Sequence, residues 1–245
     1  MAEQRVEEHS KMTDILKDYE AQEQERLERN LHYAEAGVRF IDIRQAYIAE
    51  GTKIGRGTVI YPCVVLEGSV EIGENCVIGQ NSHIVDSVIG SGTDVQSSVI
   101  LESRVGENTK VGPFAYVRPN SRIGSGCKVG DFVEIKNSYF GDGSKASHLT
   151  YVGDADVGEN VNLGCGVVFV NYDGSKKYRS VVEDGAFIGC NCNLVAPVHV
   201  GEKAYVAAGT TITRDVPEGA LHVGRVRDTS IEGWVEKKGI LNRKK

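Results

Sequence analysis

The sequence predicts an all-β solenoid of stacked parallel strands, preceded by an α-helical arm. Two observations lead to this prediction: an aliphatic residue recurs at every sixth position through most of the chain, and glycine commonly follows it. A third is that the first 36 residues lack both the repeat and any glycine or proline, and carry dense charge instead. We therefore divide the chain into a helical arm at 1–36, a solenoid domain at 37–224 and a basic tail at 225–245.

The six-residue repeat is regular enough to define the architecture. Steps of six from Ile48 to Ile84, from Val105 to Ile135 and from Val182 to Ile212 meet valine, isoleucine or leucine at all nineteen positions. Six residues turn an α-helix by about 240°, which would scatter these side chains, whereas six is a multiple of the two-residue strand period. Each unit is thus a short strand, and glycine permits the tight corner after it. Three units per coil leave room for about nine coils of about 18 residues up to Pro217.

The repeat is interrupted most strongly between Phe169 and Val182, which lie thirteen residues apart. The segment NYDGSKKYRS, Asn171 to Ser180, is therefore predicted to bulge out of the solenoid. Loops on a rigid scaffold often carry binding groups, although an insertion without a role would also explain this one.

The two ends of the chain differ from the repeat. Residues 1–36 hold ten acids and five bases, with apolar residues at helical spacing. Because this apolar stripe fails around Gln22 to Glu25, a helix packed on a surface or a partner is favoured over a long coiled coil. Residues 225–245 hold seven bases and three acids and have no repeat phase.

Charge and cysteine usage exclude several classes of protein. The formal net charge is −6, and without a basic excess neither a nucleic acid nor an anionic membrane is predicted as a partner. The chain opens MAEQRVEEHSK, without an apolar signal segment, and we expect a cytoplasmic protein. Its six cysteines are then expected to be reduced, and none has the spacing of a zinc site, so no metal is predicted.

Several uncommon strings carry a resemblance to a known family. They are VRP at 117–119, GDFVEIKN at 130–137, GSKASHLTYVGDADVGENVNLGCG at 143–166, VNYDG at 170–174 and NLVAPVHVG at 193–201. With these strings, residues 37–236 resemble the acetyltransferase half of the bifunctional bacterial enzyme that makes UDP-N-acetylglucosamine. The resemblance implies a left-handed β-helix, a homotrimer with sites between neighbouring solenoids, and transfer of the acetyl group of acetyl-CoA to the amine of glucosamine-1-phosphate.

The resemblance also assigns roles to single residues. An amine attacks only when deprotonated, so a base such as histidine must lie within about 3 Å of it. The resemblance assigns this base to His148, in SHLTY, and we expect Glu134 to orient the imidazole. An anionic phosphosugar suits arginine and lysine. The residues implied to bind the phosphosugar are Arg118, Lys136, Tyr151 and Asn162. Lys177, on the protruding loop, is expected to bind the substrate through a phosphate. Those implied to bind acetyl-CoA are Cys165, Asn171, Tyr172, Cys190, Ala208 and Arg225.

Two features depart from the full family pattern. Cys165 and Cys190 replace the commoner alanine and serine, and a thiol is a weaker hydrogen-bond donor than a hydroxyl. Residues 1–36 correspond to a linker helix and not to a nucleotide-binding half, so we expect no uridyltransferase activity. Two alternatives stay open: an acetyltransferase for a different amino sugar, and a non-catalytic solenoid that partners a separate uridyltransferase.

Overall fold

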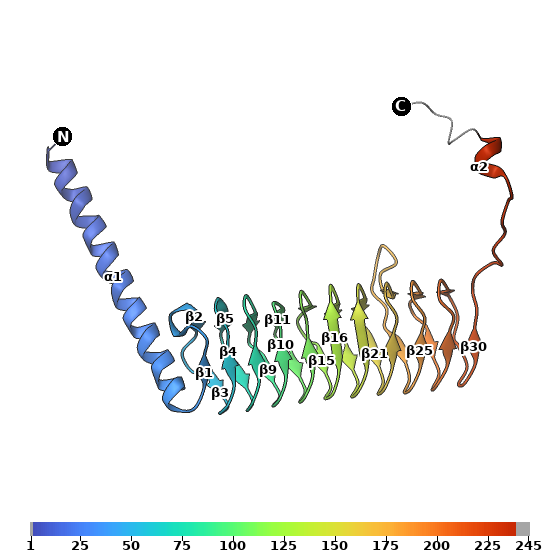
Figure 1. Cartoon of the computed structure of the whole chain (residues 1–245), viewed down its shortest axis with the longest axis horizontal. Coiled ribbons are helices and arrows are strands. Elements are labelled where there is room, and N and C mark those ends of the chain that lie inside the picture. Colours follow the sequence, from blue (N-terminus) through green and yellow to red (C-terminus); the bar gives the residue numbers. More distant parts are fainter. Residues whose placement is uncertain (1, 239–245) are drawn as a thin grey trace.

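The computed structural model describes residues 2–238 as a long helix, a solenoid and an extended tail. Figure 1 shows the solenoid as a row of coils, with helix α1 (Ala2–Glu35) leaving one end and the tail leaving the other. Three strands per coil build three parallel sheets of 11, 10 and 9 strands, and the 3-10 helix η1 (Ile43–Gln45) lies in the first coil. The chain completes about ten coils, so the predicted β-solenoid is confirmed.

Each sheet runs the length of the solenoid. The strands of the first sheet are β1 (Arg39–Phe40), β4 (Val59–Ile60), β7 (Val77–Ile78), β10 (Asp94–Val95), β13 (Lys110–Val111), β16 (Lys128–Asp131), β19 (Lys145–His148), β22 (Asn162–Leu163), β25 (Phe187–Ile188), β28 (Tyr205–Val206) and β30 (Leu221–His222). Those of the second are β2 (Ala46–Ile48), β5 (Val64–Glu67), β8 (His83–Val85), β11 (Val99–Leu101), β14 (Tyr116–Val117), β17 (Glu134–Lys136), β20 (Tyr151–Gly153), β23 (Val168–Val170), β26 (Asn193–Val195) and β29 (Thr211–Ile212). Those of the third are β3 (Lys53–Ile54), β6 (Glu71–Ile72), β9 (Val88–Ile89), β12 (Arg104–Val105), β15 (Arg122–Ile123), β18 (Tyr139–Phe140), β21 (Ala155–Val157), β24 (Ser180–Val182) and β27 (His199–Val200).

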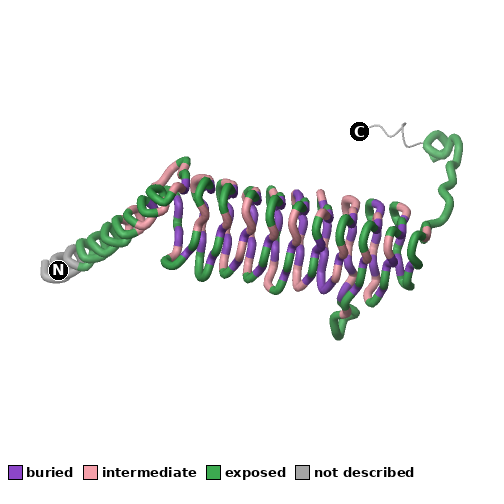
Figure 2. The backbone as a smooth tube through the Cα atoms, turned by 90° about the horizontal axis from the view of Figure 1, so that it is seen from below, coloured by how far each residue is buried: buried purple, intermediate pink, exposed green. Residues whose placement is uncertain are grey.

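The core is a stack of aliphatic side chains along the solenoid axis. Eighteen of the nineteen repeat positions are buried, and the remaining one, Ile54, packs against the core partly buried. Figure 2 shows buried segments recurring along every coil. The stack arises because in-register parallel pairing, such as Val111 with Val129, sets each inward residue directly on the next.

Helix α1 caps the first coil with its C-terminal part. The fully buried Asn30 donates to the carbonyls of Ile43 and Ala46, at 2.9 and 3.0 Å, and Tyr33 donates to the Thr52 carbonyl at 2.6 Å. Farther from the solenoid, the apolar residues of α1 are exposed: Met12, Ile15, Leu16 and Tyr19. The expected N-terminal helix is confirmed.

The tail begins after β30 and has almost no regular structure. It runs away from the last coil in Figure 1 and contains only the short helix α2 (Trp234–Lys237) within the described residues. Over residues 2–238, no helix has the length and apolar character needed to cross a membrane.

Candidate active site

His148 is paired with a carboxylate on the neighbouring coil. It ends β19, and Asp131, which ends β16, is its register partner on the adjacent parallel strand. Asp131 Oδ1 lies 2.5 Å from His148 Nδ1. The hydrogen bond from His148 holds the pKa of Asp131 below its ordinary value, so the carboxylate is ionised at neutral pH. An ionised carboxylate can only accept, so Nδ1 donates and Nε2 is the ring atom that can accept a proton.

The carboxylate of Glu134 binds a different side chain, that of Arg118. Its Oε1 accepts a hydrogen bond from Arg118 Nη1 at 2.7 Å, and this bond raises the pKa of Arg118. Register explains the difference, because Glu134 is paired with Tyr151 on the second sheet, three residues beyond His148. The expectation that Glu134 orients the imidazole is therefore corrected: among the described residues, Asp131 contacts His148.

A buried carboxylate, Asp154, anchors the residues at the far end of the second sheet. It is 6% exposed and accepts hydrogen bonds from Lys136 Nζ at 3.0 and 3.1 Å and from Asn137 Nδ2 at 2.6 Å. Asn171 Nδ2 donates to its other oxygen. Burial alone would raise the pKa of Asp154, but these hydrogen bonds outweigh burial and lower it. The same pairing raises the pKa of Lys136 against the opposing effect of burial.

The interrupted segment of the repeat forms a protruding loop between β23 and β24, as predicted (Figure 1). Both of its ends are fixed. At the start, Asn171 is 7% exposed and donates to Tyr151 Oη at 3.3 Å. At the end, Arg179 Nε donates to Asp156 at 2.6 Å and its Nη1 donates to the Asn137 carbonyl at 2.9 Å. The loop is thus a braced extension of the solenoid.

This bracing sets Lys177 beside two other cations. An antiparallel bridge joins Lys177 to Tyr172. Repulsion by the like-charged Lys136 lowers the pKa of Lys177, and Arg118 adds to this effect while Asp154 opposes it. Arg118, Lys136 and Lys177 therefore form one cation cluster, which is the arrangement expected of a site for a phosphate.

The implied acetyl-CoA residues follow a different corner of the solenoid. Cys165, Cys190 and Ala208 occupy equivalent turns on three successive coils, joined by backbone hydrogen bonds of 2.8 Å from Asn191 to Cys165 and from Gly209 to Cys190. Cys190 is exposed and Cys165 partly so. We call these three turns the turn series. The side chain of Arg225 lies at its end, beside Gly209, where a Cβ atom would be 3.7 Å from Arg225 Cδ.

The predicted residues thus fall into two groups, one around His148 and the turn series and the other around the cation cluster. Asn162 belongs to the first group, because its strand β22 is the neighbour of the His148 strand in the first sheet. Tyr151 and Asn171 lie with the cation cluster, while the exposed Tyr172 bonds the Gly174 carbonyl within the loop. Lys136 is in register with Gly153, which lies five residues and one corner of the coil beyond His148, so His148 and the cation cluster lie on different sheets of one chain.

Three residues of this region were missed by the sequence analysis: Asp131, Asp154 and Arg179. The two aspartates lie in strings already singled out, but a carboxylate in a repeat usually marks a solvated corner. Arg179 lies in the loop. Writing the coils in register would have revealed Asp131, which lies 17 residues before His148.

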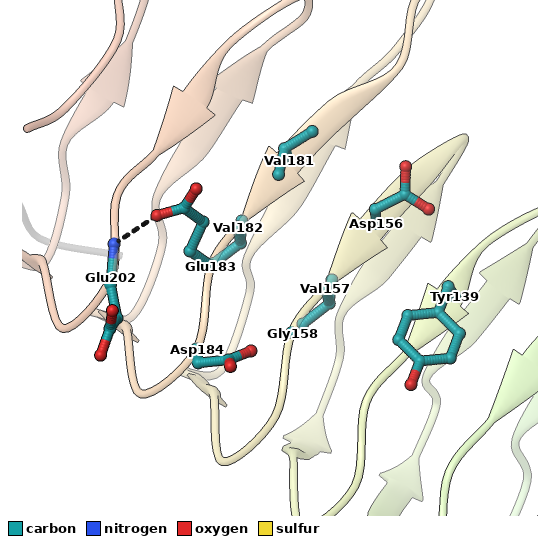
Figure 3. Close-up of a pocket in the computed structure, with 9 residues that line it drawn as sticks. All are labelled: Tyr139, Asp156, Val157, Gly158, Val181, Val182, Glu183, Asp184 and Glu202. Atoms are coloured by element: carbon teal, nitrogen blue, oxygen red, sulfur yellow. Dashed lines mark hydrogen bonds between the residues drawn. The ribbon is translucent and has the colours of Figure 1, made fainter. Parts of the chain in front are cut away.

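A pocket is lined by residues of the third sheet and its corners (Figure 3). Its carboxylates already have partners within the fold: Glu183 accepts from the Glu202 backbone at 2.9 Å and from His199 at 2.8 Å, and Asp184 accepts from the Glu159 backbone at 2.8 Å. None of the predicted site residues lines this pocket.

Comparisons with known proteins define the class. A family model described as bacterial transferase hexapeptide (six repeats) matches residues 51–86, 102–137 and 179–214. The β-solenoid of this chain is thus built from hexapeptide repeats of the bacterial transferase type.

Individual relatives are more specific. The bifunctional protein GlmU of Clostridioides difficile (strain 630) is 57% identical over 202 residues, covering 82% of this chain and 44% of that protein. The bifunctional protein GlmU of Clostridium beijerinckii is 55% identical over 211 residues, covering 86% and 46%. The chain spans about half the length of these curated relatives, which confirms its resemblance to one half of a bifunctional protein.

A solved UDP-N-acetylglucosamine acyltransferase from Arabidopsis covers 83% of this chain and is itself covered to 76%, at 17% identity. Its TM-score against this chain is 0.45.

Proposed function

We propose that the chain is an acetyl-CoA-dependent N-acetyltransferase that acts on glucosamine-1-phosphate. The observation that carries this proposal is the cation cluster: the Arg118 amide bonds the Ile135 carbonyl next to Lys136, a carboxylate holds each of these two cations, and their repulsion lowers the pKa of Lys177 on the loop. A phosphate dianion would relieve it. The 52–57% identity to bifunctional GlmU proteins agrees with this substrate class.

The proposed chemistry uses His148 as general base. Nε2 accepts a proton from the amine while the amine nitrogen attacks the thioester carbonyl carbon. The carbon–sulfur bond then breaks, and the proton passes from Nε2 to the leaving sulfur, so the products are the amide and free coenzyme A. Asn162, on the strand next to that of His148 in the first sheet, contacts the sugar in this proposal.

The turn series would bind acetyl-CoA. Cys165, Cys190 and Ala208 have small side chains, so a ligand can approach the backbone of three successive coils, and Arg225 supplies a cation at the end of the series for a coenzyme phosphate. Asn171 and Tyr172 would contact the coenzyme from the loop. The six free cysteines suit a reducing cytoplasm.

We further propose a homotrimer in which His148 of one copy meets the cation cluster of the next. His148 and Lys136 lie on different sheets of one chain, and this placement supports a shared site. Beside His148, the side chains of Phe114, Phe132 and Leu149 form an apolar column, each 57–59% exposed. All three have left-handed backbones, with φ of +59°, +54° and +48°, a conformation that costs non-glycine residues about 1 kcal/mol or more.

The equivalent turns of neighbouring coils carry residues that suit this backbone, such as Asn81, Gly166 and Asn191. The coil itself therefore does not require large apolar side chains at these strained, exposed positions. A second copy of the chain is the occupant we propose, because it would also complete the divided site.

The decisive experiment is thiol release from acetyl-CoA in the presence of glucosamine-1-phosphate, glucosamine, glucosamine-6-phosphate or N-acetylglucosamine-1-phosphate. The proposal requires the first sugar to be the best acceptor and the last, whose amine is already acylated, to be inactive. A preference for another amine would favour the alternative amino sugar. No release with any acceptor would favour a non-catalytic partner of a separate uridyltransferase. Product from UTP and N-acetylglucosamine-1-phosphate would contradict the expected lack of uridyltransferase activity.

A further inference from the structure

We infer that Asp131 is the positioning residue of the candidate base: it holds the His148 imidazole as the Nδ1–H tautomer and thereby leaves Nε2 free to accept the substrate proton. The catalytic consequence rests on the proposed function, whereas the tautomer itself does not. Nothing in the family resemblance assigns Asp131 a role.

The backbone fixes both members of the pair. Asp131 and His148 are register partners at the ends of β16 and β19. The amide of Leu149 donates to the Asp131 carbonyl at 2.9 Å, directly beside the pair, and Thr150 Oγ1 donates to the His148 carbonyl at 2.8 Å. The 2.5 Å contact between Oδ1 and Nδ1 therefore joins side chains on two fixed backbones, so forming it orders the side chains alone.

The surrounding charges leave Asp131 as the carboxylate suited to this task. The titratable groups on the strands packed around His148 are Lys128 and Asp131 on β16, Lys145 on its own strand and Cys165 in the turn after β22. Lys128 also acts on Asp131 and favours its ionised form. Glu134, the other candidate, is engaged with Arg118 at 2.7 Å.

An ionised partner on Nδ1 has two effects on a general base. It selects the tautomer whose Nε2 lone pair is available, and it stabilises the imidazolium that forms when Nε2 takes the proton. Removing the carboxylate should therefore reduce the rate of acetyl transfer more than it weakens the binding of either substrate.

The tautomer can be measured without any assay of activity. Long-range proton–nitrogen correlation spectra of ¹⁵N-histidine-labelled protein at about pH 8.5, where imidazole is neutral, distinguish the two tautomers. The resonances of His148 are assigned with His148→Gln. We expect the Nδ1–H form in the wild type and a shift toward the Nε2–H form in Asp131→Ala. Asp131→Glu should restore the wild-type form at least in part, and Glu134→Gln should leave it unchanged. Wild-type Nε2–H, or an unchanged spectrum in Asp131→Ala, would overturn the inference.

Kinetics then test the consequence. Asp131→Ala should lower kcat at least about tenfold with the KM for the sugar little changed, and should move the acidic limb of the pH–rate profile to lower pH. Glu134→Gln should act mainly on the KM for the sugar, through Arg118. If the wild type transfers no acetyl group, the proposed function fails while the tautomer result still stands; an active wild type with an unaltered Asp131→Ala profile would refute the positioning role alone.

Discussion

Lys136 Nζ lies 3.0 Å from Asp154 Oδ2, on the next coil, and the same carboxylate accepts a hydrogen bond from Asn171. One buried anion thus connects a lysine of the cation cluster with the first residue of the protruding loop. Because Asp154 is almost fully buried, the orientation of Lys136 and the position of the loop depend on each other.

Replacing Asp154 should therefore disturb both stability and substrate binding. Asp154→Asn is expected to lower the free energy of unfolding at pH 7 by about 1–3 kcal/mol, because Lys136 loses its charged partner, and to raise the KM for the sugar. The pKa of Asp154 is lowered from 3.8, so its contribution is complete above about pH 4 and is lost as the pH falls through the lower, folded-state value. Thermal unfolding against pH should show the two proteins converging in acid. Glu71→Gln, which removes an exposed pair with Lys53, is the control and should have little effect.

Removal of the base should abolish most activity without unfolding the protein. His148→Ala is expected to lower the acetyl-transfer rate by roughly a hundredfold or more, since a positioned base contributes about 10²- to 10⁴-fold. The fold should survive because His148 is exposed and the core is the inward aliphatic stack. His83→Ala is a matched control, as His83 also pairs with a carboxylate on a neighbouring coil, Glu67 at 2.9 Å, but lies far from the site. Equal losses in both variants, measured by thiol release, would argue against His148 as the base.

The cation cluster should act on the sugar and not on the coenzyme. Arg118→Ala is expected to raise the KM for glucosamine-1-phosphate more than the KM for acetyl-CoA, because it removes a charge from the phosphate site. A larger effect on acetyl-CoA would mean that the cluster binds the coenzyme instead.

The loop allows a sharper comparison between adjacent lysines. Lys177→Ala should weaken sugar binding, whereas Lys176→Ala should not, because the Lys176 ammonium lies over the Tyr178 ring, 4.8 Å from its centroid. Substrate-saturation curves at two salt concentrations measure both effects, and the difference should shrink at high salt. Similar curves for the two variants would count against Lys177 as a phosphate ligand.

The apolar column gives a direct test of assembly. Phe132→Asn removes an exposed ring, so sedimentation should show a shift from trimer toward monomer. Because asparagine tolerates the backbone at φ +54° better than phenylalanine, the monomer should lose no thermal stability. Tyr47→Asn, at a similarly exposed aromatic residue of the second sheet, is the control. A monomeric wild type that is fully active would contradict both the trimer and the shared site.

The fold could be predicted in some detail because its signal is local and repeated. Positions such as Val111, Val117 and Val129 recur every six residues, and burial of each inward residue on the one beneath it needs no information beyond that period. The protruding loop was likewise visible as a break in the period. The left-handed sense of the coil and the roles of single site residues rest on the resemblance and remain predictions.

The sequence by itself thus determined the solenoid, its helical arm and the strings that contain the site residues. Only the tertiary structure decided which carboxylate meets which cation or imidazole. The pairs that matter are 16 residues apart for Arg118 and Glu134, 17 for Asp131 and His148, and 18 for Lys136 and Asp154. Since the length of a coil varies by a residue from turn to turn, and one residue decides which side chains face each other, no constant spacing predicts these contacts.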